Sequence, residues 1–235
     1  MTDESQLPGL SKHFDHGAHD FTMVKPFGPN ILETRIPSDI LSQLISMADA
    51  LMENHNRQSY GEYLVGQIHE EPEIPLALLR EYGVFDYLHS MFAEYVLAST
   101  YCDGHNEYKR SVAQFQQGPE YHNPVYVQLE AAWLVNQMAH EYNPVHNHSQ
   151  STLSSVLYLE VPKNMQEREI PGKARIDGAI EWVYQSVGQD QNATIRTVPK
   201  VGMFYIFPAT LLHLVYPFRG PEVRRSISIN ATHRL

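Results

Sequence analysis

The stretch NPVHNHSQSTLSSVLYLEVP, from Asn143 to Pro162, joins two histidines to a run of residues typical of a β-strand. His146 and His148 are residues i and i+2, so in an extended segment both side chains point to the same face. Two imidazoles on one face offer two nitrogen ligands to one metal ion. In a chain with 13 histidines, a pair at this spacing also arises by chance. The stretch therefore predicts a β fold, and the metal site that it suggests needs support from other residues.

Further short segments with strand character follow one another in the second half of the chain. They are rich in β-branched and aromatic residues and are separated by Pro, Gly and Asn, as in a β-sandwich or barrel. The polar tract KNMQEREIPGKARIDG predicts a long loop that borders a site. The predicted strands lie in VYVQLEAAWLVNQM, TLSSVLYLEV, DGAIEWVYQSV, ATIRTV, GMFYIF, LLHLVYPF and VRRSISINAT.

The first half of the chain has helical patterns instead. After Pro37, Ser38 or Asp39 can cap a helix with a one-sided apolar stripe. After Pro75 a second helical pattern continues despite Gly83. The two stripes comprise Ile40, Leu41, Leu44, Ile45, Ala48, Leu51 and Met52, and Leu78, Leu79, Tyr82, Phe85, Leu88, Phe92, Tyr95 and Val96.

These patterns predict one domain rather than several. Residues 1–20 are polar and without pattern, so we expect a flexible N-terminal arm there. A single domain then spans residues 21–235, a length that suits one large core. Its helical part covers about residues 21–120 and its β core about residues 121–235.

The charge of the chain argues against some classes of partner. The net charge is −10, and no cluster of Lys and Arg offers contacts to phosphates, so neither nucleic acid nor an anionic membrane is expected as the main partner. The single cysteine, Cys102, excludes an intrachain disulfide and fits a reducing compartment. Without a secretory leader or a run of about 18 apolar residues, we expect a soluble, cytoplasmic protein.

A third histidine stands in an apolar run near the C-terminus. His213 lies among leucines in GMFYIFPATLLHLVYPF. A buried imidazole needs a hydrogen-bond partner or a ligand, because burying it without either costs free energy. His213 is therefore either a satisfied core histidine or a third metal ligand.

The last predicted strand, EVRRSISIN, has one polar and one mainly apolar face. Alternation puts Arg224, Ser226, Ser228 and Asn230 together, opposite a face formed by Val223, Arg225, Ile227 and Ile229. If the polar face borders a pocket, Arg224 is an anion anchor and Arg225 reaches solvent at the strand end. The alternative is that both arginines lie on a solvated face.

Taken together, these motifs resemble the iron(II)- and 2-oxoglutarate-dependent oxygenases, especially an uncharacterised branch of bacterial and phage proteins. The family pattern is H-x-(D/E), a distal His, and an Arg with a Ser or Thr about ten residues later. Here 65 residues separate His148 from His213, and 11 separate His213 from Arg224. The resemblance covers about Trp133 to Asn230, with a weaker echo in KPFGPNILETRIPSDI.

The resemblance implies a mainly β fold with N-terminal helices, whose core is a double-stranded β-helix (a cupin-like jelly roll). The helices would pack on the outer face of its larger sheet, against Ile227 and Ile229. It also implies a dioxygenase, most simply a hydroxylase, that uses Fe(II), 2-oxoglutarate and O2. No feature of the sequence selects the substrate or an oligomeric state. The implied metal ligands are His146, His148 and His213, and the implied 2-oxoglutarate contacts are Arg224, Ser226, Tyr158 and Asn136.

The chain departs from the family pattern at one ligand. The family usually has a carboxylate where this chain has His148. This fits a three-histidine iron site, a different metal, a non-catalytic site, or a carboxylate supplied from elsewhere, with Glu141 and Asp177 as candidates. Two other functions therefore stay open. One is a three-histidine cupin-type dioxygenase that does not use 2-oxoglutarate, and the other is a non-catalytic jelly-roll module that binds a metal or a small acid.

Overall fold

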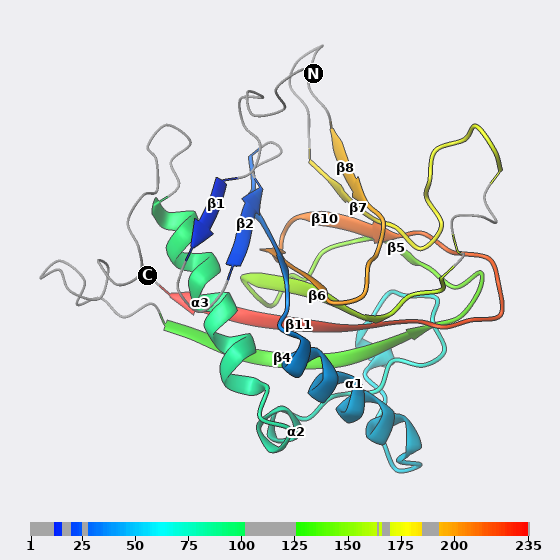
Figure 1. The fold of residues 1–235 in the computed structure, drawn as a ribbon, viewed down its shortest axis with the longest axis horizontal. Coiled ribbons are helices and arrows are strands. Elements are labelled where there is room, and N and C mark those ends of the chain that lie inside the picture. Colours follow the sequence, from blue (N-terminus) through cyan, green and yellow to red (C-terminus); the bar gives the residue numbers. More distant parts are fainter. Residues whose placement is uncertain are drawn as a thin grey trace, which may run out of the picture.

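The computed structural model describes residues 12–15, 20–24, 28–101, 126–163, 165, 170–184 and 193–234. Within them, two antiparallel sheets form the core (Figure 1). The larger sheet has the order β1 (Lys12–Asp15), β2 (Asp20–Val24), β3 (Ile31–Arg35), β9 (Met203–Pro208), β6 (Leu153–Glu160), β11 (Arg224–Arg234) and β4 (Tyr126–Gln137). The smaller sheet has the order β5 (Asn143–His146), β10 (Leu212–Val215), β7 (Ile180–Val183) and β8 (Thr194–Thr197).

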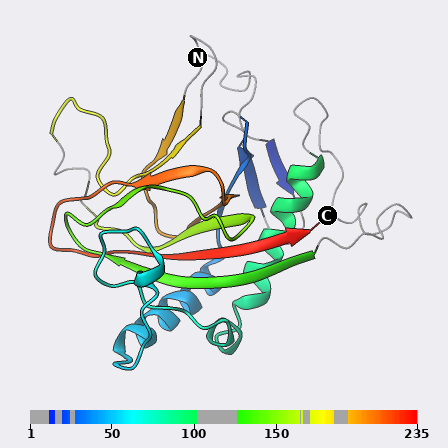
Figure 2. The ribbon, with the colours of Figure 1, turned by 180° about the vertical axis from the view of Figure 1, so that it is seen from behind.

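The helices cover one face of the larger sheet. They are α1 (Ser38–Glu53), α2 (Leu76–Glu81) and α3 (Phe85–Tyr101), with a short 3-10 helix at Gly61–Tyr63. Figures 1 and 2 show α1 and α2 on one side of β4 and β11, and the smaller sheet on the other side. The larger sheet therefore has a face toward the helices and a face toward the smaller sheet.

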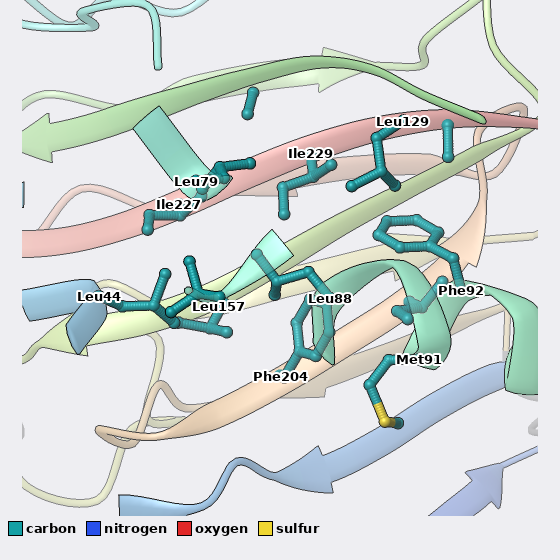
Figure 3. Close-up of a cluster of buried hydrophobic side chains, with 14 of the residues drawn as sticks. Leu44, Leu79, Leu88, Met91, Phe92, Leu129, Leu157, Phe204, Ile227 and Ile229 are labelled. Atoms are coloured by element: carbon teal, nitrogen blue, oxygen red, sulfur yellow. The ribbon is translucent and has the colours of Figure 1, made fainter. Parts of the chain in front are cut away.

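The main hydrophobic core lies between the helices and the larger sheet. Ile227 and Ile229 of β11 are buried there, as the alternation of this strand predicts. Figure 3 shows both side chains in one cluster with Leu44 of α1, Leu88 of α3 and their neighbours. The face of β11 with the isoleucines thus holds the helices on the sheet, which confirms the predicted packing.

Two details of the predicted helices are wrong. The long pattern after Pro75 is divided into α2 and α3, because Gly83 adopts a left-handed backbone (φ 69°) that ends the first helix. The first helix begins at Ser38, one or two residues earlier than a cap at Ser38 or Asp39 predicts. Pro37 occupies its N-cap position, and no side chain caps it.

The N-terminal strands and β5 were not anticipated. Lys12–Asp15 of the predicted arm form β1, while residues 1–11 and 16–19 lie outside the described part of the chain. The predicted boundaries of arm and domain stay predictions. Each of the predicted strands is present, at or close to the expected residues.

An extended segment before α2 lies along the free edge of β4. Ile74 N–H donates to Ala132 O (2.8 Å), Leu134 N–H to Pro72 O (2.9 Å), and Asn136 N–H to Glu70 O (3.0 Å). Figure 2 shows this part of the chain, in cyan, beside β4 and β11. The segment extends the larger sheet by a few residues and brings the loop between α1 and α2 next to the smaller sheet.

Among the described residues, no helix is long and apolar enough to cross a membrane.

Candidate metal centre and cosubstrate pocket

Three histidine side chains converge on one point beside the smaller sheet. His146 of β5 and His213 of β10 are direct partners in the antiparallel register. His148 follows β5 by two residues, and its backbone N–H donates to Ala209 O (2.8 Å). One ring nitrogen of each histidine lies within 4.8 Å of the others. Strand pairing therefore closes the 65-residue separation between His148 and His213.

The spacing of these nitrogens suits a metal ion. The Nε2 atoms of His148 and His213 are 3.4 Å apart. Two nitrogen ligands at about 2.1 Å from a metal, and at right angles to each other, are roughly 3 Å apart. Imidazole ligands suit iron and zinc alike. A small shift of the side chains would let the three histidines hold such an ion.

Hydrogen bonds orient two of the rings for this purpose. His146 Nδ1 lies 2.8 Å from Pro144 O, and His213 Nδ1 lies 2.9 Å from Leu211 O. Since a carbonyl oxygen only accepts, each Nδ1 carries the proton and donates it. The Nε2 lone pairs of both rings are therefore free to bind a metal.

The ring of His148 has a side-chain partner instead. Its Nδ1 lies 3.2 Å from Nδ2 of Asn230, whose Oδ1 is buried with no hydrogen-bond partner in the described part of the chain. A half-turn of this amide would offer Oδ1 to an Nδ1–H of His148. All three rings would then present Nε2 to the same point.

Burial favours the neutral form of all three imidazoles. It lowers the pKa of His146, and burial together with the charge of His146 lowers the pKa of His148 to about 4. The pKa of His213 is lowered well below its ordinary value, first by burial and then by the other two histidines. A metal ion binds the neutral imidazole. The lowered pKa values therefore favour metal binding at neutral pH, because the ion does not have to displace protons from the rings.

The polar face of β11 borders the same cavity. Arg224, Ser226 and Ser228 line it together with the three histidines, while Trp133 packs beside His148 with ring centroids 5.7 Å apart. The cavity volume of ≈ 90 Å³ is several times the roughly 10–15 Å³ that one water needs. The interpretation in which both arginines lie on a solvated face is therefore wrong for Arg224.

Arg224 is a buried cation without an anion. It is 1% exposed, and its Nε–H donates to Gly178 O (3.0 Å). Its Nη2 is buried without a hydrogen-bond partner, and no ion pair reaches it from the residues that the structure describes. Burial lowers the pKa of its guanidinium. An unpaired buried charge lowers the stability of the fold, and a negatively charged ligand bound to this guanidinium would offset that loss.

Tyr158 lies beside this guanidinium. The Arg224 Cζ atom is 4.8 Å from the centroid of the Tyr158 ring, and Tyr158 is the register partner of Ser226. Its Oη is also buried without a hydrogen-bond partner among the described residues. Burial raises the pKa of Tyr158, while the positive charge of Arg224 opposes the rise. The structure thus brings Arg224, Ser226 and Tyr158 together, as the resemblance implied.

Asn136 is not part of this group. It pairs with Arg225 in the register of β4 and β11, so it lies on the opposite face from Arg224. Its Nδ2 donates to Glu70 Oε2 (2.7 Å) and its Oδ1 accepts from Arg225 Nε (3.0 Å). The predicted contact between Asn136 and 2-oxoglutarate is therefore wrong. Arg225 does not extend into solvent either, because it donates to Asp49 of α1 (2.7 Å).

The two suspected carboxylates lie elsewhere. The carboxylate of Glu141 accepts from Met138 N–H (2.7 Å) and from the backbone and ring of His69. Asp177 is buried and forms an ion pair with Arg219 (3.4 Å). Neither lines the cavity, and neither belongs to the histidine cluster.

A different carboxylate does reach the cavity. Glu71, 3% exposed, lines it from the extended segment beside β4. Burial, and then the charge of Glu141, raise its pKa to about 7. Glu71 could not be predicted from the sequence, because the acidic tract HEEPEIP has no pattern that distinguishes a buried position from a solvated one. Its burial follows from the backbone pairing with β4.

The sequence of this part of the chain matches a known family. Residues 131–230 match the model described as "Putative 2OG-Fe(II) oxygenase", which is close to the span of Trp133 to Asn230 expected from the motifs. No curated protein matches the chain in sequence.

Solved structures of the same fold agree with this match. A prolyl-4-hydroxylase from Pseudomonas putida is 14% identical, with a TM-score of 0.51, over 87% of this chain and 93% of that chain. A prolyl hydroxylase from Trichoplax adhaerens, solved with a hypoxia inducible factor oxygen degradation domain peptide fragment, is 11% identical. Its TM-score is 0.55, over 86% of this chain and 83% of that chain.

At these identities the likeness shows the fold, and it confirms the predicted jelly-roll core. Residues 131–230 therefore match the sequence pattern of the 2OG-Fe(II) oxygenase family, whose members use Fe(II), 2-oxoglutarate and O2.

Proposed function

We propose that the protein is an iron(II)- and 2-oxoglutarate-dependent dioxygenase, most simply a hydroxylase. In this proposal His146, His148 and His213 hold the iron, and Arg224 binds 2-oxoglutarate. One observation carries it: a single cavity contains three convergent histidines and a buried guanidinium that has no anionic partner in the described part of the chain. The family whose pattern residues 131–230 match supports the same assignment.

The three histidines suit iron(II) because each offers a neutral nitrogen. When bound, iron(II) with 2-oxoglutarate and O2 supplies an oxidation that releases succinate and CO2 and hydroxylates a C–H group of the substrate. With only three protein ligands, the ion would keep further positions for 2-oxoglutarate and O2. The backbone carbonyls of Pro144 and Leu211 hold the rings of His146 and His213 in the required tautomer.

Arg224 and its neighbours bind the far carboxylate of 2-oxoglutarate. A guanidinium gives a charge-assisted and directional contact, and the hydroxyl groups of Ser226 and Tyr158 can add further hydrogen bonds. The low exposure of Arg224 excludes water from this end of the cavity, which strengthens the contact. The cosubstrate is thereby oriented with its keto acid end toward the histidines.

A second candidate function is favoured by His148, which stands where the family usually has a carboxylate. A three-histidine dioxygenase of cupin type would oxidise its substrate directly, without 2-oxoglutarate. Arg224 would then bind a carboxylate of that substrate. The two candidates differ in whether succinate is formed.

The test is the release of succinate by the full chain incubated with iron(II), 2-oxoglutarate, ascorbate and O2. We expect succinate and CO2 in equal amounts, formed slowly without substrate and faster with one. Arg225→Leu serves as the matched control for Arg224→Leu, since the two arginines are neighbours on opposite faces of β11. Binding of 2-oxoglutarate by the iron-loaded protein, measured by calorimetry, gives a second readout. An iron-loaded protein that neither binds 2-oxoglutarate nor forms succinate would contradict the proposal.

A further inference from the structure

Glu71 is a buried acid in the cavity that the proposed chemistry does not use. Glu70 and Pro72 pair with β4, and the side chain of Glu71 between them lines the cavity near Val135, the register partner of Ser226. Neighbouring strands are about 4.8 Å apart, so Glu71 lies roughly two strands to the side of β11. It therefore lines the same cavity as the histidines and Arg224, from the wall formed by the loop between α1 and α2.

No cation of the described chain neutralises this carboxylate. Among the residues that the structure describes, neither a hydrogen bond nor an ion pair reaches its oxygens. Arg57 pairs with Glu70 (3.1 Å) and Arg225 pairs with Asp49 (2.7 Å). The nearby charge is that of another acid, Glu141, which together with burial raises the pKa of Glu71. Such an arrangement costs stability, and a carboxylate of this kind in a cavity points to a ligand.

A second oxygen acceptor lies next to Glu71. A Cβ atom added at Gly66 would lie 2.2 Å from Asn143 Oδ1 and 3.4 Å from Glu71 Oε1. Both oxygens thus lie close to Gly66, and an ammonium group on the cavity side can donate hydrogen bonds of about 2.8–3.0 Å to both. Asn143 also lines the cavity. The absence of a side chain at position 66 lets the loop approach both acceptors.

The rim of the cavity beside these acceptors is apolar. Tyr63 (71% exposed) and Val65 (51% exposed) line the cavity from the loop. Gln67 N–H donates to Tyr142 O (2.8 Å) and ties the loop to the start of β5. Exposed apolar groups at a cavity mouth suit the carbon part of a ligand.

We propose that Glu71 is a substrate-binding residue, which with Asn143 accepts hydrogen bonds from the ammonium group of an amine substrate. The carbon part of the amine lies against Tyr63 and Val65, and its C–H groups extend toward the three histidines. The inference rests on the proposed function, since it names the substrate class of that same cavity. A metal ion is a poorer occupant, because one carboxylate and one amide offer too few ligands.

The test compares small ligands of matched shape. The full chain is loaded with zinc(II) and 2-oxoglutarate, so that nothing is oxidised, and the dissociation constants of benzylammonium, benzyl alcohol and benzoate are measured by ligand-observed NMR. We expect benzylammonium to bind about 10- to 100-fold more tightly than benzyl alcohol, as a charge-assisted hydrogen bond in a buried site allows. Benzoate should bind the amine site most weakly.

Two variants locate the preference. Glu71→Gln should reduce the ratio between benzylammonium and benzyl alcohol to about one and leave the affinity for the alcohol unchanged. Glu70→Gln is the matched control: Glu70 is bonded to Arg57 and Asn136, so this variant should keep the preference. Equal affinities in the wild-type protein, no binding of benzylammonium, or a preference that survives in Glu71→Gln would each overturn the inference.

The result is independent of turnover. A wild-type protein that prefers benzylammonium but neither binds 2-oxoglutarate nor forms succinate would keep the amine site and reject the proposed oxygenase function. A protein that forms succinate but has no preference would reject the amine site alone.

Discussion

The two faces of β11 differ in what they contribute to the molecule. One face carries Ile227 and Ile229, which are buried among apolar side chains of the helices. The other carries Arg224 and Ser226, which are equally buried but border a cavity, and a guanidinium nitrogen there has no hydrogen-bond partner among the described residues. Within a single strand, one face packs completely against the core, and the other lines a cavity and holds polar groups that lack hydrogen-bond partners among the described residues. Substitutions on the two faces should therefore have opposite consequences.

The largest effect is expected at the metal centre. His213→Ala should abolish the stoichiometric binding of iron(II), because it removes the ligand that pairs with His146 across β5 and β10. The apolar neighbours of His213 should keep the fold intact. Metal content after gel filtration and the circular dichroism spectrum give the two readouts. Unchanged iron content in a folded variant would reject the three-histidine assignment.

On the cavity face of β11, Arg224→Leu should weaken binding of 2-oxoglutarate by about 2–5 kcal/mol, since it removes a charge-assisted contact in a buried site. The free energy of unfolding should stay the same or rise, because the unpaired buried charge is gone. Calorimetry with 2-oxoglutarate and urea denaturation measure the two quantities. If Arg225→Leu were the variant that loses 2-oxoglutarate, the assignment of the two faces would be reversed.

On the helix face of the same strand, Ile229→Ala should lower the free energy of unfolding by about 2–4 kcal/mol, because it leaves a cavity among the side chains of the main core. Iron and 2-oxoglutarate should still bind to the folded protein. Urea denaturation and metal analysis check both statements. A variant of full stability that lost iron would contradict the separation of the two faces.

Glu71 should make the free energy of unfolding depend on pH. The folded state raises its pKa from 4.5 to about 7, so above pH 4.5 the unfolded chain releases this proton more readily than the folded protein. The loss in free energy of unfolding that results is absent below pH 4.5, grows up to about pH 7 and is then constant. Glu71→Gln should therefore raise the free energy of unfolding by up to about 3 kcal/mol at pH 8, and by less than about 1 kcal/mol at pH 5. An equal gain at both pH values would contradict this account.

How far the sequence could predict the site depended on how clearly each strand alternates. The strand EVRRSISIN has a polar and an apolar face, so the positions of Arg224 and Ile227 followed from the pattern alone. The strand that contains AAWLVNQM is buried on both faces, so the pattern of its apolar residues did not show which side chains face the cavity. Asn136 was therefore assigned to the cavity although it faces Arg225.

Glu71 and the strand β5 could not be predicted for a related reason. β5 is short and contains Pro144, which is tolerated because the strand lies at the edge of its sheet. The burial of Glu71 depends on hydrogen bonds to β4, which is more than 50 residues away in the sequence. Local patterns predicted that the three histidines and Arg224 come together, while contacts between distant segments decide what else reaches the cavity.

The smallest effect concerns the support of a ligand. Asn230 lies on the cavity face of β11, and its amide is 3.2 Å from His148 Nδ1, with its Oδ1 unpaired among the described residues. Turned by half a rotation, the amide would accept the Nδ1 proton and direct His148 Nε2 to the metal. Asn230→Leu removes this acceptor, so it should weaken metal binding about 10- to 100-fold, as the loss of a group that orients a ligand typically does. Asn230→Asp keeps an acceptor and should retain metal affinity. The measurement is a competition titration of zinc(II) with a chelator, which needs no turnover. If Asn230→Leu bound zinc(II) as tightly as the wild-type protein, His148 would be oriented by the backbone contact with Ala209 alone.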